Sequence, residues 1–348
     1  MSVRIELGDC RETLVRLAAE GLKAQCCVTS PPYFGLRDYG MDGQIGLEPT
    51  PEAYVAKMVD VFRAVRDVLA DDGVVWLNLG DSYAGSGPSG ASYQSATTKA
   101  RESKSIDGAF RISKTLGERG LTYSEKKPVP PAGLKSKDLI GIPWRVAFAL
   151  QADGWWLRQD VIWAKPNPMP ESVTDRCTKA HEYVFLLTKS ARYWYDAEAV
   201  KEPASQPIGA PSAVNQHKQV ALGTNFGGTL GTNCGPEIRN RRSVWSIASQ
   251  PYDGAHFAVM PQKLVEPCIL AGCPVGGTVL DPFNGAATVG VVALAHGRQY
   301  LGIELNPEYV RLSVGRLTDA TRQGQLFSLP PIPRPAPSAQ QTHLFEAA

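Results

Sequence analysis

Apolar strands and amphipathic helices alternate along much of this chain of 348 residues, and no other feature of the sequence limits the fold as strongly. A strand pattern at 3–7 is followed by a helical pattern at 11–22 and by a second strand at 24–29, which ends abruptly in two prolines. The next helix begins at Thr50 and Pro51, a capping hydroxyl followed by a proline suited to the first helical position. Such alternation predicts a parallel α/β sheet.

The remaining regular elements extend this pattern. The helix that starts after Thr50 keeps apolar residues at three- and four-residue spacing and is predicted to stop at Gly73. Further strands are predicted at 73–81, 155–170, 181–190, 192–200, 243–247, 277–281 and 300–305, and further helices at 138–154, 261–273, 286–296 and 306–320.

Three segments without a regular apolar period divide the chain. We predict a folded α/β domain made of 1–84 and 136–322, a basic irregular insert at 85–135, a separate irregular segment at 201–242 and a disordered Pro-rich tail at 323–348. The insert carries nine Lys and Arg against four Asp and Glu. Its composition favours a solvated loop, and a loop that meets phosphates is the alternative.

Bulk composition narrows the class of protein without identifying a partner. The net charge is +2 and the hydrophobic fraction is 43%. No apolar run approaches the length of a membrane span, and the amino terminus lacks a signal-peptide core. Seven cysteines form neither a CxxC pair nor a zinc-type cluster with histidine. We therefore expect a cytoplasmic protein with reduced thiols.

The last strand–turn–helix–strand block has the pattern of a nucleoside site. Small residues at Gly285, Ala286 and Ala287 let a ligand approach the backbone at the start of the helix. Glu304 ends the second strand 23 residues after Asp281, where a carboxylate suits the two hydroxyls of a ribose. The turn has neither a GxGxxG nor a Gly-Lys-Ser/Thr pattern. The nucleoside is therefore expected to lack a pyrophosphate, a description that S-adenosylmethionine fits.

Two motifs resemble those of amino-methylating DNA methyltransferases. DPFNGAAT at 281–288 resembles their DPFxGxGT cofactor motif, and TSPPY at 29–33 resembles their catalytic [DNS]PP[YFW] motif. RIELGDC, VIWAKPNPMP and HFAVMPQKLVEPCILA resemble further blocks of the same family, and the order of the motifs resembles its permuted beta arrangement. The resemblance implies the Rossmann-like fold of S-adenosylmethionine-dependent methyltransferases, with a seven-stranded, mostly parallel sheet, one antiparallel strand and helices on both faces. It also implies that 201–242 is the target-recognition segment.

The resemblance implies a role for each residue of the SPPY stretch. The side chain of Ser30 and the carbonyl of Pro31 would accept hydrogen bonds from an exocyclic amine and make its nitrogen more nucleophilic. Pro31 and Pro32 fix φ and remove N–H groups that would compete. Tyr33 would stack on a base flipped out of the duplex. Transfer of the methyl group would be direct, without a metal or a covalent nucleophile.

The same resemblance assigns a cofactor site around S-adenosylmethionine. Its residues are Asp9 near the adenine amine, Phe283 against the cofactor, Glu304 on the ribose, Asp281, Gly285 and Thr288 facing the methionine part, and Lys263 near the methionine carboxylate. Ala287 stands where the family has its second glycine. Its methyl group is expected to narrow the turn.

The first residue of the catalytic motif bears on the base that is modified. In the family that the chain resembles, serine goes mostly with N4 of cytosine, and Asp or Asn with N6 of adenine. We therefore predict a site-specific N4-cytosine methyltransferase that acts on double-stranded DNA. An N6-adenine enzyme and a catalytically idle DNA-binding subunit stay open as alternatives, and the motif order disfavours a protein glutamine or an RNA base as substrate. A cognate restriction endonuclease and the oligomeric state are also left open.

A cysteine and a His-Glu pair suggest a nucleophile and a metal site, but the surrounding sequence disfavours both. Cys268, which follows Pro267, resembles the nucleophile of carbon-5 cytosine methyltransferases. It lies in an apolar helical stripe, however, so packing is the expected role. His181 and Glu182 open a strand without a second histidine at helical spacing, and no metal site is predicted there.

Overall fold

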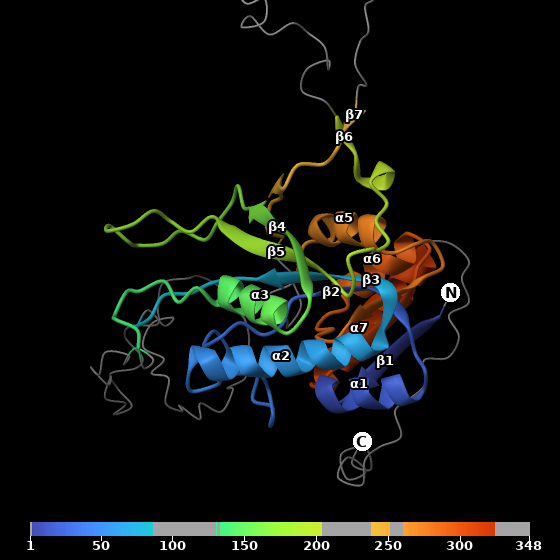
Figure 1. Cartoon of the computed structure of the whole chain (residues 1–348), viewed down its shortest axis with the longest axis horizontal. Coiled ribbons are helices and arrows are strands. Elements are labelled where there is room, and N and C mark those ends of the chain that lie inside the picture. The colour runs from blue at the N-terminus through green and yellow to red at the C-terminus, as the bar shows by residue number, and fades with distance from the viewer. Residues whose placement is uncertain (1, 86–129, 131–132, 204–237, 251–259, 324–348) are drawn as a thin grey trace, which may run out of the picture.

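The structure is a computed structural model and describes residues 2–85, 130, 133–203, 238–250 and 260–323 (Figure 1). Most of the insert and of the recognition segment predicted from the sequence, and nearly all of the predicted tail, lie outside these residues. Those expectations stay predictions. Within the part that the structure describes, no helix is long and apolar enough to cross a membrane.

The regular elements follow the chain largely in the predicted alternation. The first half contains β1 (Val3–Leu7), α1 (Cys10–Ala19), β2 (Ala24–Thr29), α2 (Pro51–Val68), β3 (Leu69–Leu79), α3 (Ile142–Ala152), β4 (Trp156–Ala164) and β5 (His181–Thr188). The second half contains the 3-10 helix η2 (Glu198–Val200), β6 (Glu202–Pro203), β7 (Ile238–Arg239), β8 (Val244–Ser246), α5 (Gln262–Gly272), β9 (Thr278–Asp281), α6 (Thr288–Ala295), β10 (Gln299–Glu304) and α7 (Pro307–Gln323).

One large sheet organises the molecule, with strands in the order β1-β10-β9-β2-β3-β5-β4-β8. The first five of these pair in parallel, β5 pairs antiparallel with both β3 and β4, and β4 pairs in parallel with β8. The predicted fold class is therefore confirmed: a mostly parallel sheet with β5 as its one reversed strand. The described sheet has eight strands where the resemblance implies seven. The additional strand is the three-residue β8, which lies within the strand predicted at 243–247 and forms a short edge beside β4.

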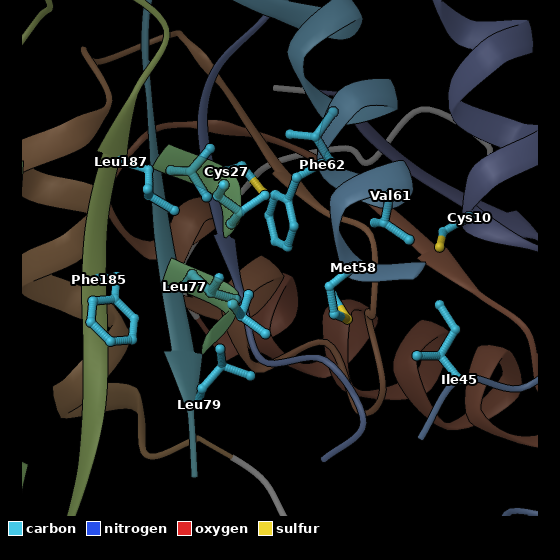
Figure 2. Close-up of a cluster of buried hydrophobic side chains, with 14 of the residues drawn as sticks. Cys10, Cys27, Ile45, Met58, Val61, Phe62, Leu77, Leu79, Phe185 and Leu187 are labelled. Atoms are coloured by element: carbon cyan, nitrogen blue, oxygen red, sulfur yellow. The ribbon is translucent and has the colours of Figure 1, made fainter. Parts of the chain in front are cut away.

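Helices cover both faces of this sheet and enclose two hydrophobic cores. In Figure 1, α1, α2 and α3 lie on one side of the sheet, and α5 and α6 lie on the other. Neighbouring strand residues point to opposite faces, so Cys27 of β2 joins the first core while Cys26 joins the second. Figure 2 shows the first core, where Met58 and Phe62 of α2 pack against the sheet. Leu317 of α7 belongs to the second core, which places that helix with α5 and α6.

Local sequence explains where two of the helices begin. The carboxylate of Asp9 caps α1 by accepting a hydrogen bond from the N–H of Arg11 at 2.8 Å. The hydroxyl of Thr50 caps α2 by accepting from the N–H of Ala53 at 3.2 Å, with Pro51 in the first turn as predicted. Side-chain oxygens at these positions satisfy N–H groups that have no partner within the helix.

Two predictions about individual elements are wrong. The helix α2 ends at Val68 instead of Gly73, because Leu69 already has extended backbone angles (φ −83°, ψ 141°) and pairs with β2. The predicted strand at 192–200 does not form. Instead, the N–H groups of Trp194 and Asp196 donate to carbonyls of two separate segments, at 2.9 and 3.0 Å, and η2 occupies the end of the stretch. These two N–H groups of the stretch therefore pair with two different segments and not with one neighbouring strand.

The two ends of the segment 201–242 meet in a small separate ladder. Strands β6 and β7 pair antiparallel, with Glu202 opposite Arg239. The Glu202 carboxylate accepts hydrogen bonds from Nε of Arg239 at 3.0 Å and from Nε of Arg242 at 2.6 Å. Figure 1 shows this pair standing away from the main sheet, next to η2. The ladder therefore fixes the point at which this segment leaves and rejoins the described fold.

Two helical glycines offer a matched test of packing between the second layer and the sheet. A Cβ added to Gly290 in α6 would lie 2.6 Å from the ring of the buried Tyr300, whereas one added to Gly315 in α7 meets nothing within 4 Å. Alanine is better than glycine in a helix by about 1 kcal/mol, while overpacking a core costs about 1–3 kcal/mol. We expect Gly315→Ala to raise the free energy of unfolding slightly and Gly290→Ala to lower it, as measured by chemical denaturation. Equal effects of the two substitutions would contradict this packing.

Candidate active site

A cavity of about 440 Å³ lies at the edge of the sheet where the parallel strands end. Its lining comes from the residues that follow β1, β2, β9 and β10, together with residues at the same edge of β3, β4 and β5. In open α/β sheets, ligands bind outside the carboxyl ends of the strands. The fold therefore places the candidate site where this class of sheet binds its ligands.

This cavity brings together two motifs that lie far apart in the chain. Ten of the eleven residues predicted for the site line it: Asp9, Ser30, Pro31, Pro32, Tyr33, Asp281, Phe283, Gly285, Thr288 and Glu304. Lys263 does not line it and is exposed in the first turn of α5. The role predicted for Lys263 remains a prediction.

A buried hydrogen bond joins the ends of β2 and β9. The hydroxyl of Thr29 donates to Oδ1 of Asp281 at 2.7 Å, although the two residues are 252 positions apart. The same oxygen accepts from the N–H of Phe283 at 3.0 Å. Burial nevertheless raises the pKa of Asp281 to about 7, and the two donors only limit this rise. The carboxyl that opens the DPF motif is thus tied directly to the TSPPY motif.

Glu304 at the end of β10 is a second carboxyl whose pKa is raised by burial, to about 7. Its two oxygens accept hydrogen bonds from the N–H groups of Gly285 and Asn306, each at 2.8 Å. The Gly285 donor holds the carboxyl against the turn between β9 and α6, and the Asn306 donor holds it at the turn between β10 and α7. The cavity therefore contains two carboxyls, at Asp281 and Glu304, that change charge near neutral pH.

The third predicted acidic residue, Asp9, behaves differently. Burial alone would raise its pKa, but hydrogen bonds from the guanidinium and the N–H of Arg11 outweigh that effect and lower it. Asp9 therefore stays ionised at mildly acidic pH values at which Asp281 and Glu304 are protonated.

The expectation that Ala287 narrows the turn is wrong. Ala287 is fully buried, does not line the cavity, and packs within the second core. It adopts the left-handed backbone conformation (φ 56°) that glycine takes without strain. The alanine methyl group thus affects backbone strain and core packing and does not reduce the space for a ligand.

The SPPY stretch forms a braced turn in the wall of the same cavity. The hydroxyl of Tyr54 in α2 donates to the carbonyl of Pro32 at 2.9 Å. The ring of Tyr33 lies so close to Gly80 that a Cβ there would come within 2.5 Å of it. A hydrogen bond of 3.4 Å links the hydroxyl of Ser30 to that of Tyr33. The turn is therefore held from α2, from the end of β3 and from within.

The sequence did not indicate two residues that contact the Tyr33 hydroxyl or a third residue that pairs with one of them. This hydroxyl contacts Oε2 of Glu182 at 2.7 Å and Oδ1 of Asn78 at 3.1 Å. Glu182 also forms a salt bridge with Lys165, and all three residues line the cavity. A polar Asn within the apolar run of β3, and a Glu at the start of β5, were the available signals. Neither signal indicated the tyrosine that they contact.

The cysteine that resembles a nucleophile packs as expected. The thiol of Cys268 is buried in α5, its pKa is raised by burial, and it donates to the carbonyl of Leu264 at 3.3 Å. The six described cysteines, among them Cys26 and Cys27 in the cores, are all free thiols. This agrees with the expectation of reduced cysteines for the part of the chain that the structure describes.

The SPPY turn and the DPF turn therefore lie in one cavity at the carboxyl edge of a mostly parallel, Rossmann-like sheet. Residues 24–315 match the model of a DNA methylase family (N6_N4_Mtase), and the chain belongs to that family. Membership confirms the predicted class, an amino-methylating DNA methyltransferase that depends on S-adenosylmethionine.

Named relatives agree with this assignment. The chain is 45% identical to the type II methyltransferase M.SmaI of Serratia marcescens, over 91% of each protein. It is 46% identical to the type II methyltransferase M.Cfr9I of Citrobacter freundii, over 89% of this chain and 86% of the relative.

Solved structures agree in fold. The cytosine-N4-specific PvuII DNA methyltransferase has a TM-score of 0.56 at 17% identity and covers 93% of both chains. TTHA0409 of Thermus thermophilus, crystallised with S-adenosyl-L-methionine, has a TM-score of 0.53 at 20% identity, over 91% of this chain and 94% of that one.

The Thr29–Asp281 hydrogen bond can be tested by stability measurements at two pH values. Thr29→Val removes the donor while keeping the shape, so the ionised carboxylate of Asp281 loses one partner. We expect a loss of about 1–3 kcal/mol in the free energy of unfolding at pH 8. The loss should be smaller at pH 5.5, where Asp281, with a pKa of about 7, is protonated. Thr29→Ser keeps the hydroxyl and serves as the control. An equal loss at both pH values would contradict the assignment.

Proposed function

We propose that this protein methylates the N4 amine of cytosine at specific sites in double-stranded DNA. The observation that carries the proposal is that one cavity holds Ser30, at the first position of the catalytic motif, together with Asp281 and Glu304 of the cofactor block. Serine at that position favours cytosine in the family. The PvuII structure, whose name states cytosine-N4 specificity, supports the fold. The choice of cytosine as the methylated base rests on the motif.

The buried carboxyls fit the proposed cofactor site. A carboxylate at Glu304 would accept both hydroxyls of a ribose, and a negative Asp281 would favour a cationic group nearby. Asp9, Phe283, Gly285 and Thr288 line the same cavity and would complete the site, as the resemblance implies. S-adenosylmethionine would supply an electrophilic methyl group. The exposed Lys263 would reach its carboxylate only if the site extends beyond the described cavity lining.

The catalytic turn fits an amine in a flipped base. The hydroxyl oxygen of Ser30 and the carbonyl of Pro31 would accept hydrogen bonds from the two N–H bonds of the amine and so favour a more nucleophilic nitrogen. The rigid prolines keep these acceptors in place before the base arrives, which reduces the cost of ordering them. The ring of Tyr33, which lines the cavity, would cover one face of the base and repay part of the lost stacking.

The partners follow from the same reasoning. Double-stranded DNA is the substrate, and the segment 201–242, whose ends meet in the β6–β7 ladder, is proposed to recognise its sequence. The type II names of the relatives support a restriction endonuclease of the same specificity as a further partner. Such an endonuclease would cut the sequence that this protein protects.

Identification of the methylated nucleoside tests the proposal. Purified protein is incubated with unmethylated DNA and labelled S-adenosylmethionine, and the digested nucleosides are separated and weighed by mass spectrometry. We expect N4-methylcytosine from the wild type and a loss of about 10²-fold or more in rate from Ser30→Ala. N6-methyladenine would establish the adenine alternative with the same fold. No labelled nucleoside, with cofactor binding intact, would indicate an idle subunit.

The raised pKa values predict how cofactor affinity depends on pH. Glu304 and Asp281 have pKa values of about 7 in the free protein, so both are largely protonated at pH 5.5 and largely ionised at pH 7.5. A site that needs their negative charge should bind S-adenosylmethionine about tenfold or more tightly at the higher pH. Calorimetric titration at both values should show this. Glu304→Gln should bind more weakly and show a shallower dependence, and a pH-independent wild-type affinity would contradict the roles assigned to the carboxyls.

A further inference from the structure

Polar side chains link the catalytic serine to a carboxylate on β5. The hydroxyl of Ser30 donates to the hydroxyl oxygen of Tyr33 at 3.4 Å, and the hydroxyl of Tyr33 donates to Oε2 of Glu182 at 2.7 Å. All three residues line the cavity. Both hydrogen bonds run in the same direction, away from Ser30 and toward Glu182. The Ser30 oxygen keeps lone pairs to accept a further hydrogen bond.

The far end of this chain of hydrogen bonds is built to hold a negative charge. The second oxygen of Glu182 forms a salt bridge with Lys165, whose ammonium also lies 4.2 Å from the centre of the Trp163 ring. The side-chain amide of Asn78 donates to Glu182 at 3.2 Å and to the carbonyl of Tyr183 at 3.1 Å. Charge-assisted hydrogen bonds of this kind are stronger than neutral ones and fix the position of the Glu182 side chain. Asn78 is itself 2% exposed, so its contacts are not exchanged with solvent.

Methylation of an amine creates a proton that must leave. When the nitrogen of the exocyclic amine forms its bond to the methyl carbon, the bond from that carbon to sulfur breaks and the nitrogen becomes positively charged. The neutral methylated base then forms by loss of one N–H proton. A proton acceptor connected to the amine by hydrogen bonds lets this step occur within the cavity.

We infer that Glu182 accepts this proton through Ser30 and Tyr33, an inference that rests on the proposed function. The N–H proton passes to the Ser30 oxygen, the Ser30 hydroxyl proton passes to Tyr33, and the Tyr33 hydroxyl proton passes to Glu182. Each hydroxyl gives one proton and receives one, so both end neutral, and Glu182 ends as a carboxylic acid. Its side chain is 16% exposed, so water can take the proton and restore the carboxylate.

The environment of Tyr33 agrees with this route. Burial, with the negative charge of Glu182 beside it, raises the pKa of the phenol well above its usual value. The resting phenol is therefore protonated. It passes a proton on by donating its own proton to Glu182 while it accepts one from Ser30. The 3.4 Å contact between Ser30 and Tyr33 is long for a hydrogen bond, as such contacts commonly are before substrate binds. The same tyrosine can still cover the base with its ring, since the relay uses only its oxygen.

Two conservative variants separate this relay from stacking and from structure. Tyr33→Phe keeps the ring and removes the relay oxygen, while Glu182→Gln keeps an acceptor and removes the charge. Matched controls are Tyr193→Phe, whose hydroxyl accepts from Arg158, and Glu20→Gln, whose carboxylate pairs with Arg4 and Arg16. Neither control residue lines the cavity.

Single-turnover methylation is measured beside two binding signals. These are the affinity for S-adenosylmethionine and the fluorescence of 2-aminopurine placed at the target cytosine, which rises when the base leaves the stack. We expect both relay variants to lose about 10²-fold in rate with binding and flipping unchanged. The double variant should lose no more than the worse single one, because the residues act as a unit. The controls should keep the wild-type rate.

Other outcomes overturn the inference. A wild-type rate for Glu182→Gln would exclude the carboxylate as acceptor, and full activity of Tyr33→Phe would leave stacking as the only role of the tyrosine. Losses that appear in flipping or affinity, and not in the transfer rate, would assign the network a purely structural role. Failure of the proposed function is distinguishable, because the wild-type protein would then produce no methylated cytosine while flipping and cofactor signals could still be read.

Discussion

The hydrogen bond between Thr29 and Asp281 is the contact on which the rest of the site depends. It is buried, 2.7 Å long, and joins residues 252 positions apart in the chain. It can form only because β2 and β9 are neighbours in the sheet and end at the same edge. Removing a hydrogen-bond donor from a buried carboxylate destabilises the folded protein far more than an exposed hydrogen bond stabilises it. The pairing of these two strands therefore brings the SPPY turn and the DPF turn together.

Carboxyl groups with different hydrogen-bond partners lie at this contact and on either side of it. Toward α6 and β10, Glu304 and Asp281 hold carboxyls against backbone N–H groups, with pKa values near 7. Toward β3, β4 and β5, the carboxylate of Glu182 is paired with Lys165 and receives the Tyr33 hydroxyl. In the proposed function the first side holds the cofactor and the second side holds the base and disposes of its proton. Direct transfer needs the two to meet, and one cavity contains both.

The sequence predicts the framework well and the contacts between distant elements poorly. The positions of β1, β2, α1 and α5 follow from the apolar period, and the start of α2 follows from its Thr50 cap. The resemblance to amino-methylating DNA methyltransferases implies the single reversed strand. The end of α2 is misplaced because its apolar period continues into β3, and 192–200 resembles a strand because aromatic residues are frequent there. Asn78 and Glu182 were missed as partners of Tyr33 because they lie 45 and 149 positions away from it. Only strand order reveals that proximity.

A crystal structure of the protein with S-adenosylmethionine would test the central claim most directly. The account predicts the ribose hydroxyls on the carboxylate of Glu304, the methionine part beside Asp281, and the methyl carbon directed across the Thr29–Asp281 contact toward Ser30. A cofactor bound outside this cavity, or one with its methyl group directed away from Ser30, would contradict it.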